Sequence, residues 1–184
     1  MNRKHFVAII ALVSLSISAF AQKGQISLED IWKSRKFSAD AVYGINSMND
    51  GAHYTSLEYG KAGTSIVKYD YNTGTPENLL NSENLSDVER FGSYTFSDNE
   101  TKVLLATETE AIYRHSTRSK FYVYDFNKKV LRLLSSGKQR YATFSPDGKH
   151  VAFVRDNNIF VKDLEKGTEI QVTKDGKKNA IING

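Results

Sequence analysis

From about residue 41 onward, apolar and polar residues alternate in short runs that are separated by turn residues. Runs of four to eight residues with a period of two are typical of β-strands. The separating segments are rich in Asn, Asp and Gly, which is the chemistry of tight turns. We therefore predict an all-β fold. The expected strands cover 52–58, 64–71, 90–96, 102–107, 119–126, 129–134, 140–144, 149–155, 158–164 and 169–173.

One turn-and-strand phrase recurs about every 48 residues. It covers residues 94–106 and again 141–154, with a weaker copy at 48–56. Phe96 and Phe144 hold the same place in two copies and lie 48 residues apart. A repeat of this length built from short strands is typical of the four-stranded blades of a β-propeller.

A second phrase, an apolar strand that ends in Asp, occurs once in each repeat. The three aspartates are Asp70, Asp125 and Asp163, and we expect each to cap the turn that follows it. The order of strands and turns within a repeat is that of an antiparallel meander. We predict a partial β-propeller of about three four-stranded antiparallel blades plus the start of a fourth. Because a propeller closes on itself, these blades are expected to belong to a larger ring.

The N-terminal residues 1–21 have the pattern of a secretory signal peptide. Arg3 and Lys4 are followed by an apolar run over 6–17 and a small-x-small site at 19–21. The alternative is a membrane anchor, but the run is shorter than the roughly 20 apolar residues that span a bilayer. We expect export to the periplasm or the medium, with no membrane span after cleavage.

Residues 22–40 are expected to form a lead-in to the propeller of residues 41–184. Ser27 stands three residues before Asp30 and ahead of an apolar pair, which predicts a capped helix start.

The charge and the cysteine content exclude two classes of protein, those that bind nucleic acid through a basic surface and those held together by disulfides. Without Arg3 and Lys4 the chain keeps 23 basic and 21 acidic residues, and its lysines are scattered through turns. This pattern does not indicate a nucleic-acid-binding surface. No cysteine is present, so an exported protein of this kind has no disulfide framework. We expect no cofactor.

Known catalytic motifs are missing from the sequence. It contains no Gly-x-Ser-x-Gly, no His-Glu-x-x-His and no phosphate-binding loop, so we predict no catalytic and no metal-binding residue. His53, His115 and His150 lie far apart along the chain. Glu108 and Glu110 are spaced to share one face of a strand, and an exposed edge is their expected place.

Arg114 is the candidate binding residue. It lies within an extra stretch of the middle repeat, residues 108–119, and insertions on a rigid scaffold often carry ligand contacts. An Arg there offers a fixed fork of donors to a carbonyl or carboxylate. The alternative is a solvent-facing loop that Arg114 only stabilises. Arg118, four residues on, is expected to be neutral if it points to solvent.

Several of these phrases together resemble one family. They are the Leu28–Ile31 lead-in, the Arg114-His-Ser phrase with the Tyr-x-Tyr-Asp strand that ends at Asp125, and the Ala142–Val154 run with its Ser-Pro-Asp-Gly turn. The chain resembles the N-terminal part of a dipeptidyl peptidase IV-type serine exopeptidase of the prolyl oligopeptidase clan. The resemblance covers nearly all of the chain after the signal peptide.

The resemblance implies an eight-bladed propeller that caps an α/β-hydrolase domain. It also implies that the whole enzyme removes dipeptides with Pro or Ala in second place from peptide N-termini. It implies that Arg114 hydrogen-bonds a substrate carbonyl. The family's Asp-Trp-x-Tyr-Glu-Glu phrase, which binds the free amine, and its catalytic triad are expected past Gly184, so this chain alone is expected to be inactive. The implied partners are a peptide with a free N-terminus and the hydrolase domain, and a homodimer is one assembly that the resemblance allows.

Two other interpretations remain open at this point. The chain could be a non-enzymatic propeller module that binds a partner at the cell envelope, or a complete small β-protein of the envelope. The Arg-His-Ser insertion favours the peptidase over the binding module. The unclosed repeat count argues against a complete small protein.

Overall fold

The computed structural model describes residues 26–39, 43–61 and 63–184. The signal peptide predicted for residues 1–21 lies outside these residues. The described residues fall into a short N-terminal unit and an all-β unit that starts at residue 43, and each is described by itself. No helix within these ranges is long and apolar enough to cross a membrane.

The N-terminal unit contains the short helix α2 (Leu28–Trp32), which begins at a capping box. The Ser27 hydroxyl accepts a hydrogen bond from the Asp30 backbone N–H at 3.1 Å, and the Asp30 carboxylate accepts one from the Ser27 N–H at 3.1 Å. These two bonds satisfy backbone donors that the first helical turn leaves free. The helix start that the sequence predicts at Ser27 is therefore present.

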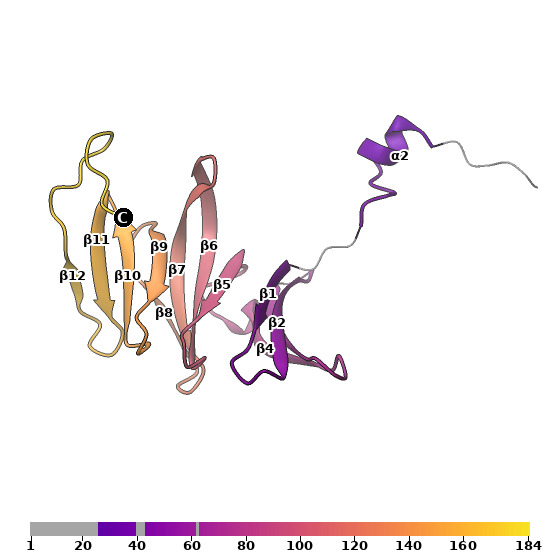
Figure 1. Cartoon of the computed structure of the whole chain (residues 1–184), viewed down its shortest axis with the longest axis horizontal. Helices are drawn as coiled ribbons and strands as arrows, with labels where there is room; N and C mark the ends of the chain where they lie inside the picture. The colour runs from indigo at the N-terminus through magenta and orange to yellow at the C-terminus, as the bar shows by residue number, and fades with distance from the viewer. Residues whose placement is uncertain (1–25, 40–42, 62) are drawn as a thin grey trace, which may run out of the picture. The chain divides into compact units, whose positions relative to one another are not determined.

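The all-β unit consists of three four-stranded antiparallel sheets, each a simple meander (Figure 1). The first is built from β1 (Tyr43–Ser47), β2 (His53–Tyr59), β3 (Thr64–Asp70) and β4 (Pro76–Asn81). The second is built from β5 (Ser93–Phe96), β6 (Lys102–Tyr113), β7 (Ser116–Asp125) and β8 (Val130–Leu133). The third is built from β9 (Arg140–Phe144), β10 (His150–Arg155), β11 (Asn158–Asp163) and β12 (Glu169–Gln171). A 3-10 turn, η2 (Ser82–Asn84), follows the first sheet. The all-β, three-blade architecture predicted from the repeat is confirmed.

Two of the strands, β1 and β4, are absent from the sequence prediction. Both are edge strands of the first sheet, so each pairs with only one neighbour. β4 contains Pro76 and carries Glu and Asn residues, which have low strand propensity, and an edge position tolerates them. After β12 the described residues form an isolated bridge between Lys177 and Ile181 and no further strand, so the predicted start of a fourth blade is present here only as irregular chain.

The middle sheet is buried on both faces. Leu105 of β6 lies in an apolar cluster shared with the first sheet, and its neighbour Leu104 lies in a cluster shared with the third. Both leucines are almost fully buried, and burial is continuous from Val103 to Thr107. A strand covered on both sides needs an unbroken apolar run, which explains why β6 does not alternate.

The repeated turns meet at one end of the blades. The Asn49 backbone N–H donates to the Glu100 carboxylate at 2.8 Å, and the Asn49 side-chain amide donates to the Asp98 carbonyl at 2.6 Å. In the next pair, a Cβ placed on Gly148 would lie 3.4 Å from the Ser97 Cβ. Equivalent turns of neighbouring blades are therefore in contact, as the 48-residue repeat requires.

The three repeated aspartates cap turns, as predicted. Asp70 accepts hydrogen bonds from two backbone N–H groups at 2.8 Å each, Asp125 accepts one at 2.9 Å, and Asp163 accepts two at 2.8 and 2.9 Å. These bonds favour the ionised carboxylate, and the pKa of Asp70 and the pKa of Asp163 both lie below the ordinary value.

A buried tyrosine links the first and second blades. The Tyr94 hydroxyl donates to the Gly44 carbonyl at 2.6 Å and lies 2.8 Å from the Thr55 hydroxyl. Gly44 has a φ of +60° and a Cβ there would lie 2.9 Å from the Leu57 Cβ, so only glycine fits this close approach.

Candidate functional site

The β6–β7 hairpin extends beyond the other strands of its blade. β6 has 12 residues and β7 has 10, and Tyr113 pairs with Ser116 across a turn made by Arg114 and His115 (Figure 1). Residues 108–119, which the sequence marks as an insertion, therefore form an extended hairpin rather than a loop. The extension places Arg114 at the tip of a paired scaffold, at the end opposite the contacting turns.

Arg114 lies in the turn of the hairpin with a left-handed backbone. Its backbone φ of +48° lies in the left-handed region, which is uncommon for a residue with a Cβ and costs of order 1–3 kcal/mol. Its Nε donates to the Tyr113 hydroxyl at 3.1 Å, and its guanidinium lies 5.4 Å from the Tyr113 ring centroid. Among the described residues it has no other hydrogen-bonded partner, so the two terminal nitrogens remain available to a ligand.

The extension starts at a β-bulge. The register shifts between Thr107 and Glu110, and Glu108 has a φ of +48°. Glu108 and Glu110 do not act as a carboxylate pair, because each faces cations. Glu108 lies 3.5 Å from the Lys120 ammonium.

Glu110 pairs with both Arg118 and Lys138, the latter at 3.2 Å. Hydrogen bonds from Lys138 and then from Arg118 lower the pKa of the Glu110 carboxyl. Arg118 is exposed but pairs with Glu110 across the two strands of the hairpin extension. Lys138 links the same carboxylate to the segment that leads into the third blade.

The third blade is joined to this hairpin by backbone bonds. Ser119 and Gln139 exchange two N–H···O bonds of 2.9 and 2.8 Å. The Gln139 side chain is fully buried, and its amide nitrogen donates to the carbonyls of Ser135, Ser136 and Gly137. These bonds fix the connection between the blades and hold β9 beside β7.

A cavity of about 570 Å³ opens between the hairpin extension and the third blade. The sheet and turn residues around it include apolar side chains and the carboxylate of Asp156. Its cationic lining residues are Arg118, Lys138, Arg140, Arg155 and Lys178.

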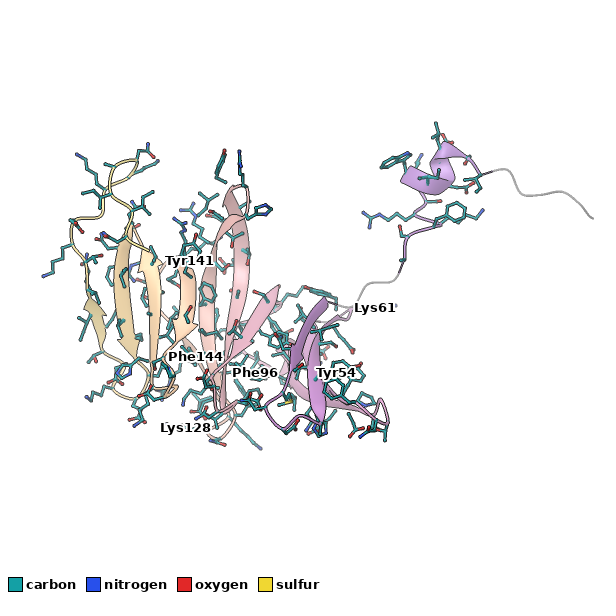
Figure 2. The ribbon with its side chains drawn as sticks, in the orientation of Figure 1. Tyr54, Lys61, Phe96, Lys128, Tyr141 and Phe144 are labelled. Carbon is teal, nitrogen blue, oxygen red and sulfur yellow. The ribbon has the colours of Figure 1, made fainter. Side chains whose placement is uncertain are left out.

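Tyr141 follows the cavity-lining Arg140 and lies at the end of β9 nearer the hairpin tip, while Phe144 lies toward the other end of the strand (Figure 2). The Arg140 guanidinium donates to the Tyr141 hydroxyl at 2.8 Å and lies 4.8 Å from the ring centroid. The hydrogen bond from Arg140, with a further one from Ser116, lowers the pKa of the Tyr141 phenol. Tyr141 therefore connects β9 to the turn of the hairpin.

The sequence prediction names Arg114 as the candidate binding residue, and it does not anticipate the cationic cavity. Its lysines and arginines come from the hairpin, the connection to β9, the β10 end and the C-terminal segment. No local cluster marks them, because only the blade packing brings them together.

The histidines are not brought together. His53 lies between two aspartates, with Nδ1 2.6 Å from Asp50 and Nε2 3.8 Å from Asp70. His150 holds the equivalent place in the third blade, 3.8 Å from Asp163. These groups brace the turns at the opposite end of the blades. Within residues 26–39, 43–61 and 63–184 no group of three or more His, Asp or Glu side chains could hold a metal ion.

Known proteins similar to this chain include one family model and several peptidases. Residues 97–184 match the family model described as the dipeptidyl peptidase IV (DPP IV) N-terminal region. A probable dipeptidyl-aminopeptidase B of Sclerotinia sclerotiorum is 29% identical over 162 residues, which cover 79% of this chain and 17% of that protein. The human prolyl endopeptidase FAP is 29% identical over 125 residues, which cover 67% of this chain and 16% of that protein.

Among solved structures, the crystal structure of Porphyromonas gingivalis dipeptidyl peptidase 4 is similar, with a TM-score of 0.75 and 41% sequence identity. The similarity covers 84% of this chain and 22% of that one. The chain thus spans about a fifth of the length of the relatives it matches. Three meander blades, a family match over residues 97–184 and this structural neighbour together support a fragment similar to the dipeptidyl peptidase IV-type N-terminal β-propeller.

Proposed function

We propose that this chain is the propeller portion of an exported serine-type dipeptidyl peptidase that removes Xaa-Pro or Xaa-Ala dipeptides from peptide N-termini. In this proposal the propeller binds and gates the peptide, and an α/β-hydrolase domain performs the proteolysis. Residues 1–21 act as the signal peptide, 22–40 as the lead-in and 41–184 as the propeller. The names of the relatives, dipeptidyl-aminopeptidase and dipeptidyl peptidase 4, support the reaction class.

The observation that carries the proposal is the position of Arg114. The extended hairpin presents it at a tip, and Tyr113 occupies only the Nε of its guanidinium. A guanidinium stays charged at any working pH and offers two parallel N–H donors. Such a group can hold a peptide backbone carbonyl near the bond that is cleaved.

The expected size of this contribution follows from the type of bond. A hydrogen bond to a charged group contributes about 1.5–3 kcal/mol. Since each 1.4 kcal/mol corresponds to a factor of ten, Arg114→Ala should lower kcat/KM by about 10- to 150-fold. Arg114→Lys should recover only part of this loss, because one ammonium cannot reproduce the planar fork.

The test measures kcat/KM on Gly-Pro and Ala-Pro chromogenic substrates, together with the melting temperature, in the full-length protein that joins this chain to its hydrolase domain. Arg132→Ala is the matched control, because Arg132 is an exposed arginine on β8, away from the hairpin tip. If Arg114→Ala lowers the melting temperature and leaves kcat/KM unchanged, Arg114 only stabilises its own turn and the proposal fails.

A further inference from the structure

We propose that the cavity between the β6–β7 extension and the third blade is a carboxylate-binding subsite for acidic side chains of peptide substrates. The inference rests on the proposed function, since it names a class of peptide that the same end of the propeller would prefer. Its evidence is separate from Arg114, which does not line the cavity.

The charge of the cavity favours an anion. Five cationic side chains line it, against the one carboxylate of Asp156. Two further carboxylates form ion pairs with these cations. Glu110 pairs with Arg118 and Lys138, and Glu169 pairs with Arg155. With both counted, the site keeps an excess of two positive charges.

The uncompensated cations are Arg140 and Lys178. Within the described residues neither has a carboxylate partner. Arg140 uses one terminal nitrogen to donate to the Tyr141 hydroxyl, and its Nε is buried with no hydrogen-bond partner. Within the described residues the other terminal nitrogen of Arg140 has no hydrogen-bond partner, so it can donate to a bound carboxylate.

Arg140 is also held in one orientation, because its guanidinium stacks at 4.8 Å on the Tyr141 ring. Tyr141 lies at an irregularity in the β9–β10 pairing and has a φ of +54°. Bulges of this kind re-aim side chains and recur next to binding sites. A fixed guanidinium loses little side-chain entropy on binding, which favours a specific anion contact.

The apolar part of the lining suits a peptide rather than a bare ion. Ile112, Val154 and Ile182 line the same cavity, next to the cationic groups. The volume of about 570 Å³ lies within the range of ligand pockets, roughly 300–1,000 Å³. An acidic side chain offers an aliphatic stem for the apolar residues and a carboxylate for Arg140 and Lys178.

The position of the cavity connects it to the hairpin tip. Ala111, Ile112 and Arg118 belong to the same extension that carries Arg114. In this proposal a peptide whose backbone is held at Arg114 can place a negative side chain in the cavity of the same hairpin extension.

A binding experiment on the full-length protein tests this without any catalysis, because the N-acetyl peptides used lack the free N-terminus that the proposed reaction needs. Two dye-labelled peptides are compared, N-acetyl-Ala-Glu-Ala amide and its Gln counterpart, by fluorescence anisotropy in dilute protein. We expect the Glu peptide to bind roughly tenfold more tightly, which corresponds to about 1.4 kcal/mol. The difference should shrink in 0.5 M salt, because the cavity is open to solvent.

Three variants locate the site. Arg140→Gln should abolish most of the Glu–Gln difference and Lys178→Gln should reduce it, while Arg132→Gln, at an exposed position on another strand, should retain it. Far-UV circular dichroism checks that each variant keeps its β structure. Lys178 is exposed and has no described partner, so its substitution tests the site even if Arg140→Gln disturbs the fold.

Several outcomes would overturn the assignment. One is equal affinity for the two peptides. A second is a Glu–Gln difference that survives in both Arg140→Gln and Lys178→Gln. A third is competition by inorganic phosphate as strong as by the Glu peptide, which would show a general anion site. A normal kcat/KM for Arg114→Ala would refute the proposed function but would leave this difference in affinity unaffected, so the two failures can be told apart.

Discussion

The two leucines at the centre of β6 offer a sharp test of the blade architecture. Leu104 is 2% exposed and Leu105 is 0% exposed, yet their side chains lie in different apolar clusters. Successive residues of a strand point to opposite faces, so this arrangement requires a blade on each side of the sheet. Truncating either side chain should therefore open a cavity in a well-packed interface.

The magnitude follows from burial. Removing a buried Leu side chain to Ala costs about 2–5 kcal/mol, as the sum of lost transfer free energy and the cavity left behind. With a urea m-value of roughly 1–3 kcal/mol per molar, a loss of this size lowers the unfolding midpoint by about 1 M or more. Leu104→Ala and Leu105→Ala should show shifts of similar size.

The assay is urea unfolding of the chain, followed by circular dichroism, with Leu133→Ala as the matched control. Leu133 is 43% exposed on β8, so its truncation should cost less than either buried leucine. A large loss for one leucine and almost none for its neighbour would mean that the sheet has only one covered face. That result would refute the stacking of blades on both sides.

Two further predictions concern the turns and the link between blades. The pKa of Asp163 is lowered first by the backbone hydrogen bond from Lys166, so its contribution to stability is present above the ordinary value of 3.8 and is lost as the pH falls through the lower folded value. Urea midpoints should therefore fall on acidification below about pH 4, less steeply in Asp163→Asn, and an identical slope in the variant would contradict this role. Tyr94→Phe removes the donor to the Gly44 carbonyl and should cost about 0.5–1.5 kcal/mol in urea unfolding, because a hydrogen bond between the two blades is lost. A neutral result would show that Tyr94 links the two blades by packing alone.

Sequence reasoning captures the features of this fold that are local. The Asn-Asp-Gly-type turns, the strands that end in Asp70, Asp125 and Asp163, and the capped helix at Ser27 all depend on residues within a few positions of one another. Their chemistry can be read from the chain, and the structure shows each of them.

The features that sequence reasoning misses depend on tertiary contacts. β4 becomes a strand because β3 pairs with it at an edge, despite Pro76 and a weak propensity. The 108–119 stretch continues the hairpin through a β-bulge, and no residue type in the sequence predicts this bulge. The cationic cavity collects Arg118, Arg140 and Lys178 from segments far apart in the chain, so it exists only once the second and third blades are packed.

Arg114 lies between these two cases. The Arg-His-Ser phrase and its place in the insertion mark Arg114 in the sequence. Its left-handed backbone and its hydrogen bond to the Tyr113 hydroxyl are known only from the structure of the hairpin turn. The geometry supports a role for the guanidinium beyond its own loop, because most of its donors remain available.

The central claim, that Arg114 binds a peptide backbone carbonyl, is tested most directly by a crystal structure of the full-length protein with a bound Ala-Pro peptide. We predict a guanidinium nitrogen of Arg114 within about 2.7–3.2 Å of a peptide carbonyl oxygen, the range of an N–H···O hydrogen bond. A peptide bound in the active site with Arg114 still engaged only by Tyr113, and no carbonyl within hydrogen-bonding distance, would contradict the account.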